Sequence, residues 1–281
     1  MGYAMKSFLQ RKLRRSLYGS AWSRAAYTNL GVVIREVRCA IPQFYTIRYP
    51  VRSLLRCVQV LLSAFVRLLM GRSLRYSFGF RGEDRIIAGI LKPIITESGF
   101  YVEVGCNHPQ FHSNTYGLYR VGWRGICIDA NDKLVRKYGL FRPRDIAVCA
   151  LVSNSEGEVD YYRIENDVLS TVDQANVAQA VAEGLHYEVE KRNTAGLTSI
   201  LDQYGAPAQF ELLSIDAEEH DYEVLTSLDF DRYRPKLVVV EDEEFSFSEL
   251  ADNRFVRFLT AQQYHLVGYV LKNAYFLRKD E

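Results

Sequence analysis

The chain has 281 residues, of which 48% are hydrophobic and 25% charged, and this composition excludes disorder over most of its length. The net charge of +1 hides two opposite parts: residues 1–80 carry 14 basic residues against one acidic residue, and residues 81–281 carry 21 against 33. The five cysteines form no CxxC pair, which argues against a disulfide framework or a common zinc motif. We therefore divide the sequence into a basic, mainly helical segment, 1–80, and a larger domain, 81–281.

The basic segment contains one apolar run, residues 57–70. This run is about 14 residues long and includes Arg67, whereas a membrane-spanning helix needs about 20 mostly apolar residues. Flanking arginines make residues 51–75 a candidate helix for an anionic membrane surface. A helix that packs on the larger domain is the equal alternative. Nucleic acid is the weaker reading, because the segment holds no RNA-binding motif.

In the larger domain, apolar periodicity predicts alternating strands and helices. We expect helices at 83–96, 114–120, from 132, at 174–183, 198–203, 219–228 and 248–262, and strands at 100–105, 124–130, 146–153, 156–164, 210–217, 236–241, 264–271 and 273–279. This alternation predicts a doubly wound, mostly parallel sheet with helices on both faces.

The last two expected strands follow each other directly and predict an antiparallel terminal hairpin. Such an ending is typical of the Rossmann-like class I methyltransferase fold and not of dinucleotide-binding dehydrogenases. The first 30 residues lack the apolar core of a secretory signal. We expect a cytoplasmic protein, with peripheral binding to the inner face of the membrane as an open alternative.

Ligands of such sheets bind at the carboxyl ends of the strands. The first strand ends in Glu103 and Gly105, without the GxGxxG pattern that cradles a pyrophosphate. This argues against NAD or FAD but not against S-adenosylmethionine, which carries no phosphate. The second strand ends in Asp129, which can accept hydrogen bonds from both ribose hydroxyls. The competing interpretation is an Asx turn or a helix N-cap at Asn131.

Acidic residues also follow the strands at 210–217 and 236–241. Asp216 and Glu241 are candidate catalytic residues, with His220 as the nearest candidate base. No metal is predicted, and a divalent cation, if any, would be held by Asp216, Glu241 and Asp242.

Four segments, at 101–131, 169–172, 211–230 and 233–244, resemble the FkbM family of methyltransferases in order and spacing. The resemblance covers roughly residues 99–278. It implies S-adenosylmethionine as cofactor and a small-molecule or glycan acceptor, such as the hydroxyl of a sugar, glycolipid or natural product. The candidate cofactor-binding residues within the matched region are Glu103, Gly105, Asn107, Asn114, Asp129, Ala130, Asn131, Ala150 and Leu151.

The sequence departs from the family at Glu219, where members usually have a glycine. If that glycine is needed for the backbone, the turn differs here. Two alternatives therefore stay open: an inactive methyltransferase-fold binding module in glycan assembly, and an RNA methyltransferase that uses the basic segment.

Overall fold

The computed structural model describes residues 21–45, 50–92, 99–164, 171–172 and 174–279. The chain divides into two compact units, Met1–Tyr76 and Ser77–Glu281. The last residues of the helix expected at 83–96, and part of the segment at 169–172, lie outside the described residues.

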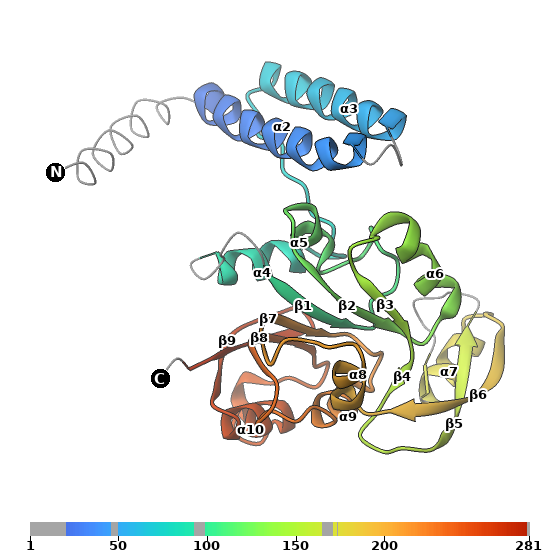
Figure 1. Ribbon diagram of the computed structural model, residues 1–281. Helices are drawn as coiled ribbons and strands as arrows, with labels where there is room; N and C mark the ends of the chain where they lie inside the picture. Colours follow the sequence, from blue (N-terminus) through green and yellow to red (C-terminus); the bar gives the residue numbers. More distant parts are fainter. Residues whose placement is uncertain (1–20, 46–49, 93–98, 165–170, 173, 280–281) are drawn as a thin grey trace. The chain divides into compact units, whose positions relative to one another are not determined.

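The first unit contains two antiparallel helices, α2 (Ala21–Tyr45) and α3 (Pro50–Leu69), which lie side by side (Figure 1). The Asn29 side chain joins them, because its Nδ2 donates to the Ala64 carbonyl at 3.0 Å and its Oδ1 accepts from the Leu74 N–H. The core between the helices is small and centres on Val60, Ala64 and Leu74. None of the helices in the described part of the chain has the length and apolar character to cross a bilayer.

The second unit is built on a seven-stranded sheet in the order β3-β2-β1-β7-β8-β10-β9. The strands are β1 (Phe100–Val104), β2 (Arg124–Asp129), β3 (Ile146–Cys149), β7 (Gln209–Ile215), β8 (Arg234–Glu241), β9 (Tyr264–Val270) and β10 (Asn273–Arg278). The five neighbouring strands β3, β2, β1, β7 and β8 pair in parallel, whereas β10 is antiparallel to both β8 and β9. The doubly wound class I methyltransferase fold with a terminal hairpin is confirmed.

Both faces of this sheet are buried (Figure 1). On β1, Val102 and Val104 join one core cluster, and Tyr101 joins the other, because successive side chains point to opposite faces. This is why the strands read as continuous apolar runs. The helices of the unit are α4 (Glu83–Leu91), α5 (Tyr116–Arg120), α6 (Asp132–Phe141), α7 (Gln174–Ala182), α8 (Leu197–Gln203), α9 (Asp221–Thr226) and α10 (Arg254–Ala261).

A second sheet, in the order β4-β6-β5, was not expected. The run predicted as one strand at 146–153 breaks at Ala150, and β4 (Leu151–Val152) leaves the main sheet to pair with β6 (Tyr187–Ala195). Strand β5 (Glu158–Ile164) pairs antiparallel with β6. Strand β6 escaped prediction because its sequence, YEVEKRNTA, is mostly charged or polar and largely exposed.

Two predicted helices differ in their extents. The helix expected at 248–262 is interrupted, because a short 3-10 helix, η2 (Phe247–Glu249), precedes α10. Asn253 is the N-cap of α10, and its side chain accepts a hydrogen bond from the Val256 N–H. The helix expected from residue 219 begins at Asp221, because Glu218 and Glu219 adopt a left-handed backbone.

Candidate functional site

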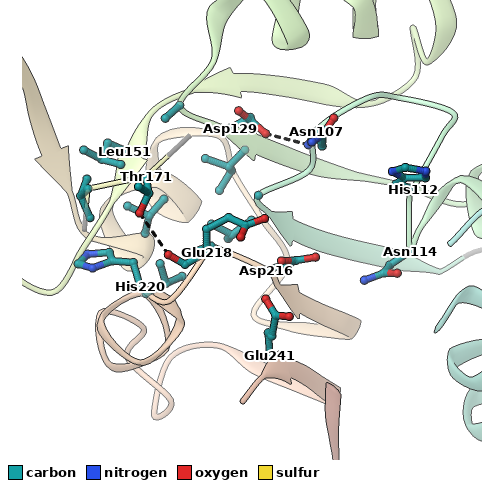
Figure 2. A pocket seen from close by; sticks show the side chains of 18 of the residues that line it. Asn107, His112, Asn114, Asp129, Leu151, Thr171, Asp216, Glu218, His220 and Glu241 are labelled. Atoms are coloured by element: carbon teal, nitrogen blue, oxygen red, sulfur yellow. Dashed lines mark hydrogen bonds between the residues drawn. The ribbon is translucent and has the colours of Figure 1, made fainter. Parts of the chain in front are cut away.

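A cavity of about 550 Å³ opens at the carboxyl ends of β1, β2, β7 and β8. Figure 2 shows Asp129, Asp216 and Glu241 projecting into it from three of these strand ends. Five acidic side chains and two basic ones line it. The acidic residues are Glu83, Asp129, Asp216, Glu218 and Glu241, and the basic ones are Arg81 and Lys272.

Gly105 forms the floor where β1 ends. It has a φ of 72°, and a Cβ built on it would lie 1.6 Å from the Asp216 carbonyl oxygen. Its N–H donates to the Ile128 carbonyl at 3.0 Å, so the turn is held between the ends of β2 and β7. Only glycine fits this position, because any side chain would collide with the Asp216 backbone at the end of β7.

Glu103 does not line the cavity, and the prediction that it contacts the cofactor directly is corrected. Its carboxylate is buried behind the wall, where it accepts hydrogen bonds from the Asn114 N–H at 3.1 Å and the Thr115 hydroxyl at 2.5 Å. Glu103 thereby fixes the loop that carries Asn114. Asn114 does line the cavity, and its Nδ2 donates to the Ser214 hydroxyl.

A buried arginine completes this support. Arg142 is 0% exposed and lies 3.6 Å from Glu103 and 2.7 Å from Asp145. It also donates to the Thr115 and Tyr101 hydroxyls. Burial lowers the pKa of the Arg142 guanidinium, but nearby acidic groups, including Asp145, outweigh this effect and raise the pKa above its ordinary value. The guanidinium is therefore always charged. Sequence reasoning missed Arg142, because it follows helix α6 without any motif around it.

Asp129, at the end of β2, faces the cavity. Its Oδ2 accepts from the Asn107 N–H at 2.8 Å, as drawn in Figure 2, and its Oδ1 accepts from the Asn131 N–H at 2.8 Å. Two backbone donors therefore hold the carboxylate in a fixed orientation.

Asn131 itself is 1% exposed and caps α6 by accepting from the Lys133 N–H. The expectation that it lies at the ribose is corrected, since its side chain is occupied by the N-cap. Four other candidate cofactor-binding residues do line the cavity: Asn107, Ala130, Ala150 and Leu151. The last two, with Val152, form an apolar wall.

Asp216 and Glu241 point toward one another in the cavity (Figure 2). Asp216 is open to the cavity but surrounded by protein atoms. This enclosure, with the nearby Asp221 and Glu218 carboxylates, raises its pKa to about 8. Burial and Asp216 raise the pKa of Glu241 to about 8 in the same way, and Lys272 opposes the rise. The pair therefore holds at least one proton near neutral pH.

The turn after β7 is strained. Glu218 and Glu219 have φ of 50° and 71°. The position where the family has glycine therefore keeps the conformation that glycine prefers, in spite of the substitution. Glu218 lines the cavity, its carbonyl accepts from the Thr171 hydroxyl, and burial with the Glu241 charge raises the pKa of its side chain to about 7.

His220 also lines the cavity, but away from the carboxyl pair (Figure 2). Its Nε2 lies 3.1 Å from the Ser153 hydroxyl, and its Nδ1 lies 3.7 Å from Glu223.

The model of the methyltransferase FkbM domain matches residues 103–266, more than half of the chain. The chain belongs to the FkbM methyltransferase family. No curated protein matches. Among solved structures, a TehB-like SAM-dependent methyltransferase from Corynebacterium glutamicum is similar, with 13% identity, coverage of 79% of this chain and 97% of that one, and a TM-score of 0.36.

Within the described ranges, no group of three or more His, Cys, Asp and Glu residues is arranged to hold a metal ion. Asp242 was expected as the third ligand of a divalent cation, beside Asp216 and Glu241, but it does not line the cavity. It is buried and accepts a hydrogen bond from the Asn253 side chain at 2.6 Å, so the expected set of three ligands is corrected.

Several residues of the FkbM cavity were not predicted as site residues. Thr171 comes from the matched segment at 169–172 and pairs with Tyr162 of β5. Lys272 comes from the turn of the terminal hairpin and lies 3.9 Å from Glu241. The order of the matched segments could have indicated Thr171, but only the fold brings the hairpin turn to the cavity.

Proposed function

We propose that this FkbM-family protein is an S-adenosylmethionine-dependent O-methyltransferase acting on a hydroxyl of a sugar, glycolipid or natural product. The observation that carries the proposal is the excess of carboxylates around a cavity of about 550 Å³ at the ends of the parallel strands. An acidic cavity favours a cationic ligand, and the turn at Gly105 provides no phosphate cradle.

The residues present fit this cofactor. Asp129 presents to the cavity a carboxylate, the type of group that accepts hydrogen bonds from ribose hydroxyls, and Ala150 and Leu151 provide an apolar surface for an adenine ring. Gly105 lines the cavity without a side chain. When bound, S-adenosylmethionine supplies an electrophilic methyl group on a positively charged sulfur.

The carboxyl pair gives the cavity a place for the proton of the acceptor. An acceptor hydroxyl loses its proton as its oxygen takes the methyl group, and an ionised Asp216 or Glu241 receives that proton. Because the pKa of both groups is raised to about 8, they are stronger bases than ordinary carboxylates. Lys272, near Glu241, favours the ionised form. Orientation of the acceptor would supply much of the remaining rate enhancement.

Calorimetry tests the cofactor step. We expect micromolar binding of S-adenosylmethionine by the full chain and a loss of at least tenfold in affinity in Asp129→Ala. Asp252→Ala is the matched control, because Asp252 is exposed and outside the cavity. Absence of binding by the unaltered protein would refute the enzyme and favour a binding module.

The acceptor is tested with isotope-labelled S-adenosylmethionine and a panel of glycans, glycolipids, hydroxylated natural products and RNA. A product that is one methyl group heavier and stable to mild base, as an ether is, supports O-methylation of an alcohol. Methylation of RNA alone, with steeply salt-dependent retention, would overturn the choice of acceptor but not the cofactor.

A further inference from the structure

Helix α3 turns its apolar side away from its partner helix. It packs on α2 through Ser53, Val60 and Ala64, which are all buried. Its outward side chains are each at least 45% exposed: Val51, Leu54, Leu55, Val58, Leu61, Leu62, Phe65, Val66 and Leu69. At about 100° per residue these nine lie opposite the three buried ones. This distribution is the reverse of that in an ordinary surface helix.

Helix α2 adds to the exposed apolar surface. Trp22 is 50% exposed, and Tyr27, Leu30 and Ile34 are exposed as well. We call the nine exposed apolar side chains of α3 the outer face of the helix pair. Monomeric proteins rarely leave so many apolar side chains in water on one small unit, so the outer face requires an occupant.

The charge of the helix pair identifies the kind of occupant. Seven arginines of the unit are exposed: Arg24, Arg35, Arg38, Arg52, Arg67, Arg72 and Arg75. Glu36, the single acid in residues 1–80, is buried and lies 3.5 Å from Arg56. The exposed surface described for this unit is therefore apolar and positive, without an exposed carboxylate.

We propose that the α2–α3 helix pair docks on an anionic phospholipid bilayer, with α3 lying parallel to the surface. Its 20 residues extend about 30 Å, long enough for the outer face to enter the acyl boundary over several turns while arginines at its flank meet lipid phosphates. Such a helix lies on a membrane and does not cross it.

Other occupants fit the same observations less well. A second copy of the chain would bring one positive unit against another. Among the described residues of the other unit, the exposed large apolar side chains are spread over separate elements, such as Leu140 on α6, Val181 on α7 and Phe247 on η2, and form no matching apolar stripe. A lipid surface satisfies both the apolar area and the charge.

Flotation of the full chain with vesicles tests the docking. We expect the protein to float with vesicles of phosphatidylcholine containing 30% phosphatidylglycerol, and at least tenfold less with phosphatidylcholine alone or in 0.5 M salt. Leu62→Glu should lower the partition coefficient at least tenfold, because it places a charge in the outer face. The matched control is Leu140→Glu, at an exposed leucine of α6, which should float as the unaltered chain does.

Tryptophan fluorescence gives a second measurement, which does not depend on whether a variant with a substitution in α3 still folds. The chain has two tryptophans, of which Trp22 is exposed and Trp123 is 1% exposed. Anionic vesicles should shift the emission to shorter wavelength, and brominated lipids should quench it. Trp22→Phe should lose both effects.

Three outcomes would overturn the proposal. The first is that the unaltered chain does not float with the anionic vesicles. The second is that Leu140→Glu lowers flotation as much as Leu62→Glu. In the third, Leu62→Glu instead abolishes a dimer seen by sedimentation, or lowers the melting temperature of the other unit, which would identify a second copy or the chain itself as the occupant. None of these results depends on methyl transfer.

Discussion

The acidic cavity should make cofactor affinity depend on pH. Near neutrality the Asp216–Glu241 pair is partly protonated, since burial and neighbouring carboxylates raise the pKa of both groups to about 8. A cation in the cavity favours the ionised form and lowers these pKa values. We therefore expect the affinity for S-adenosylmethionine to rise with pH between 6 and 8 and to level off above about 9.

The size of the effect follows from proton linkage. If one carboxyl has a pKa of about 8 in the free protein, and binding lowers it to about 7, the dissociation constant falls roughly fivefold between pH 6 and pH 8. If binding lowers the pKa far below 6, the fall is roughly fiftyfold. The expected change therefore lies between these limits, with up to one proton released per cofactor bound.

The assay is calorimetry at pH 6, 7 and 8 in buffers of different ionisation enthalpy, with S-adenosylhomocysteine as the reference ligand. The reference shares the α-amino group, which titrates near pH 8, but lacks the charge on sulfur. The ratio of the two dissociation constants therefore isolates the effect of the sulfonium. Asp216→Asn should flatten this ratio, and Glu244→Gln, outside the cavity, should not. A ratio in the unaltered protein that changes less than twofold from pH 6 to pH 8 would refute the reasoning.

Three further predictions concern stability. Arg142→Lys should lower the free energy of unfolding in urea by about 3 kcal/mol or more, because the buried carboxylates of Glu103 and Asp145 lose the guanidinium that they share; a loss under 1 kcal/mol would contradict the role given to Arg142. Glu219→Gly should be about 1 kcal/mol more stable than Glu219→Ala, since its φ is 71°; equal stabilities would show that the backbone there is relaxed. Burial raises the pKa of Asp221 to about 7, so its contribution to stability is complete below pH 4 and lost as pH rises through 7. Asp221→Asn should therefore change from neutral or destabilising at pH 4 to stabilising at pH 8 in thermal melts, and a pH-independent difference would contradict the shift.

The sequence patterns predicted the main sheet because its strands are buried on both faces. Runs such as KLVVVE have no competing interpretation at their length, and the charged or Gly-containing segments between them mark the turns. The second sheet could not be predicted in the same way. Strand β6 is mostly charged or polar, and it forms because β4 and β5 provide backbone partners on either side.

The sequence predicted the site residues that stand at strand ends, but not those whose positions depend on contacts with distant segments of the chain. Asp129, Asp216 and Glu241 project into one cavity because parallel strands end at the same edge of the sheet. Glu103 stands at an equivalent place in the sequence, yet Arg142 and the loop at 113–115 draw its carboxylate to the other side of the wall. The local sequence around Glu103 does not indicate that its carboxylate pairs with an arginine 39 positions later.

Backbone strain in the described residues gathers at this cavity. Six non-glycine residues in the described part of the chain have a positive φ. Three of them, Asn107, His112 and Glu218, line the cavity, and a fourth, Glu219, follows Glu218 in the sequence. Such conformations persist only where surrounding contacts enforce them. For the loop at 112–115, the enforcing contacts are those of Glu103 and Arg142 with Asn114 and Thr115. The buried ion pair therefore acts on the site through the loop, and weakening it should loosen cofactor binding before it unfolds the sheet.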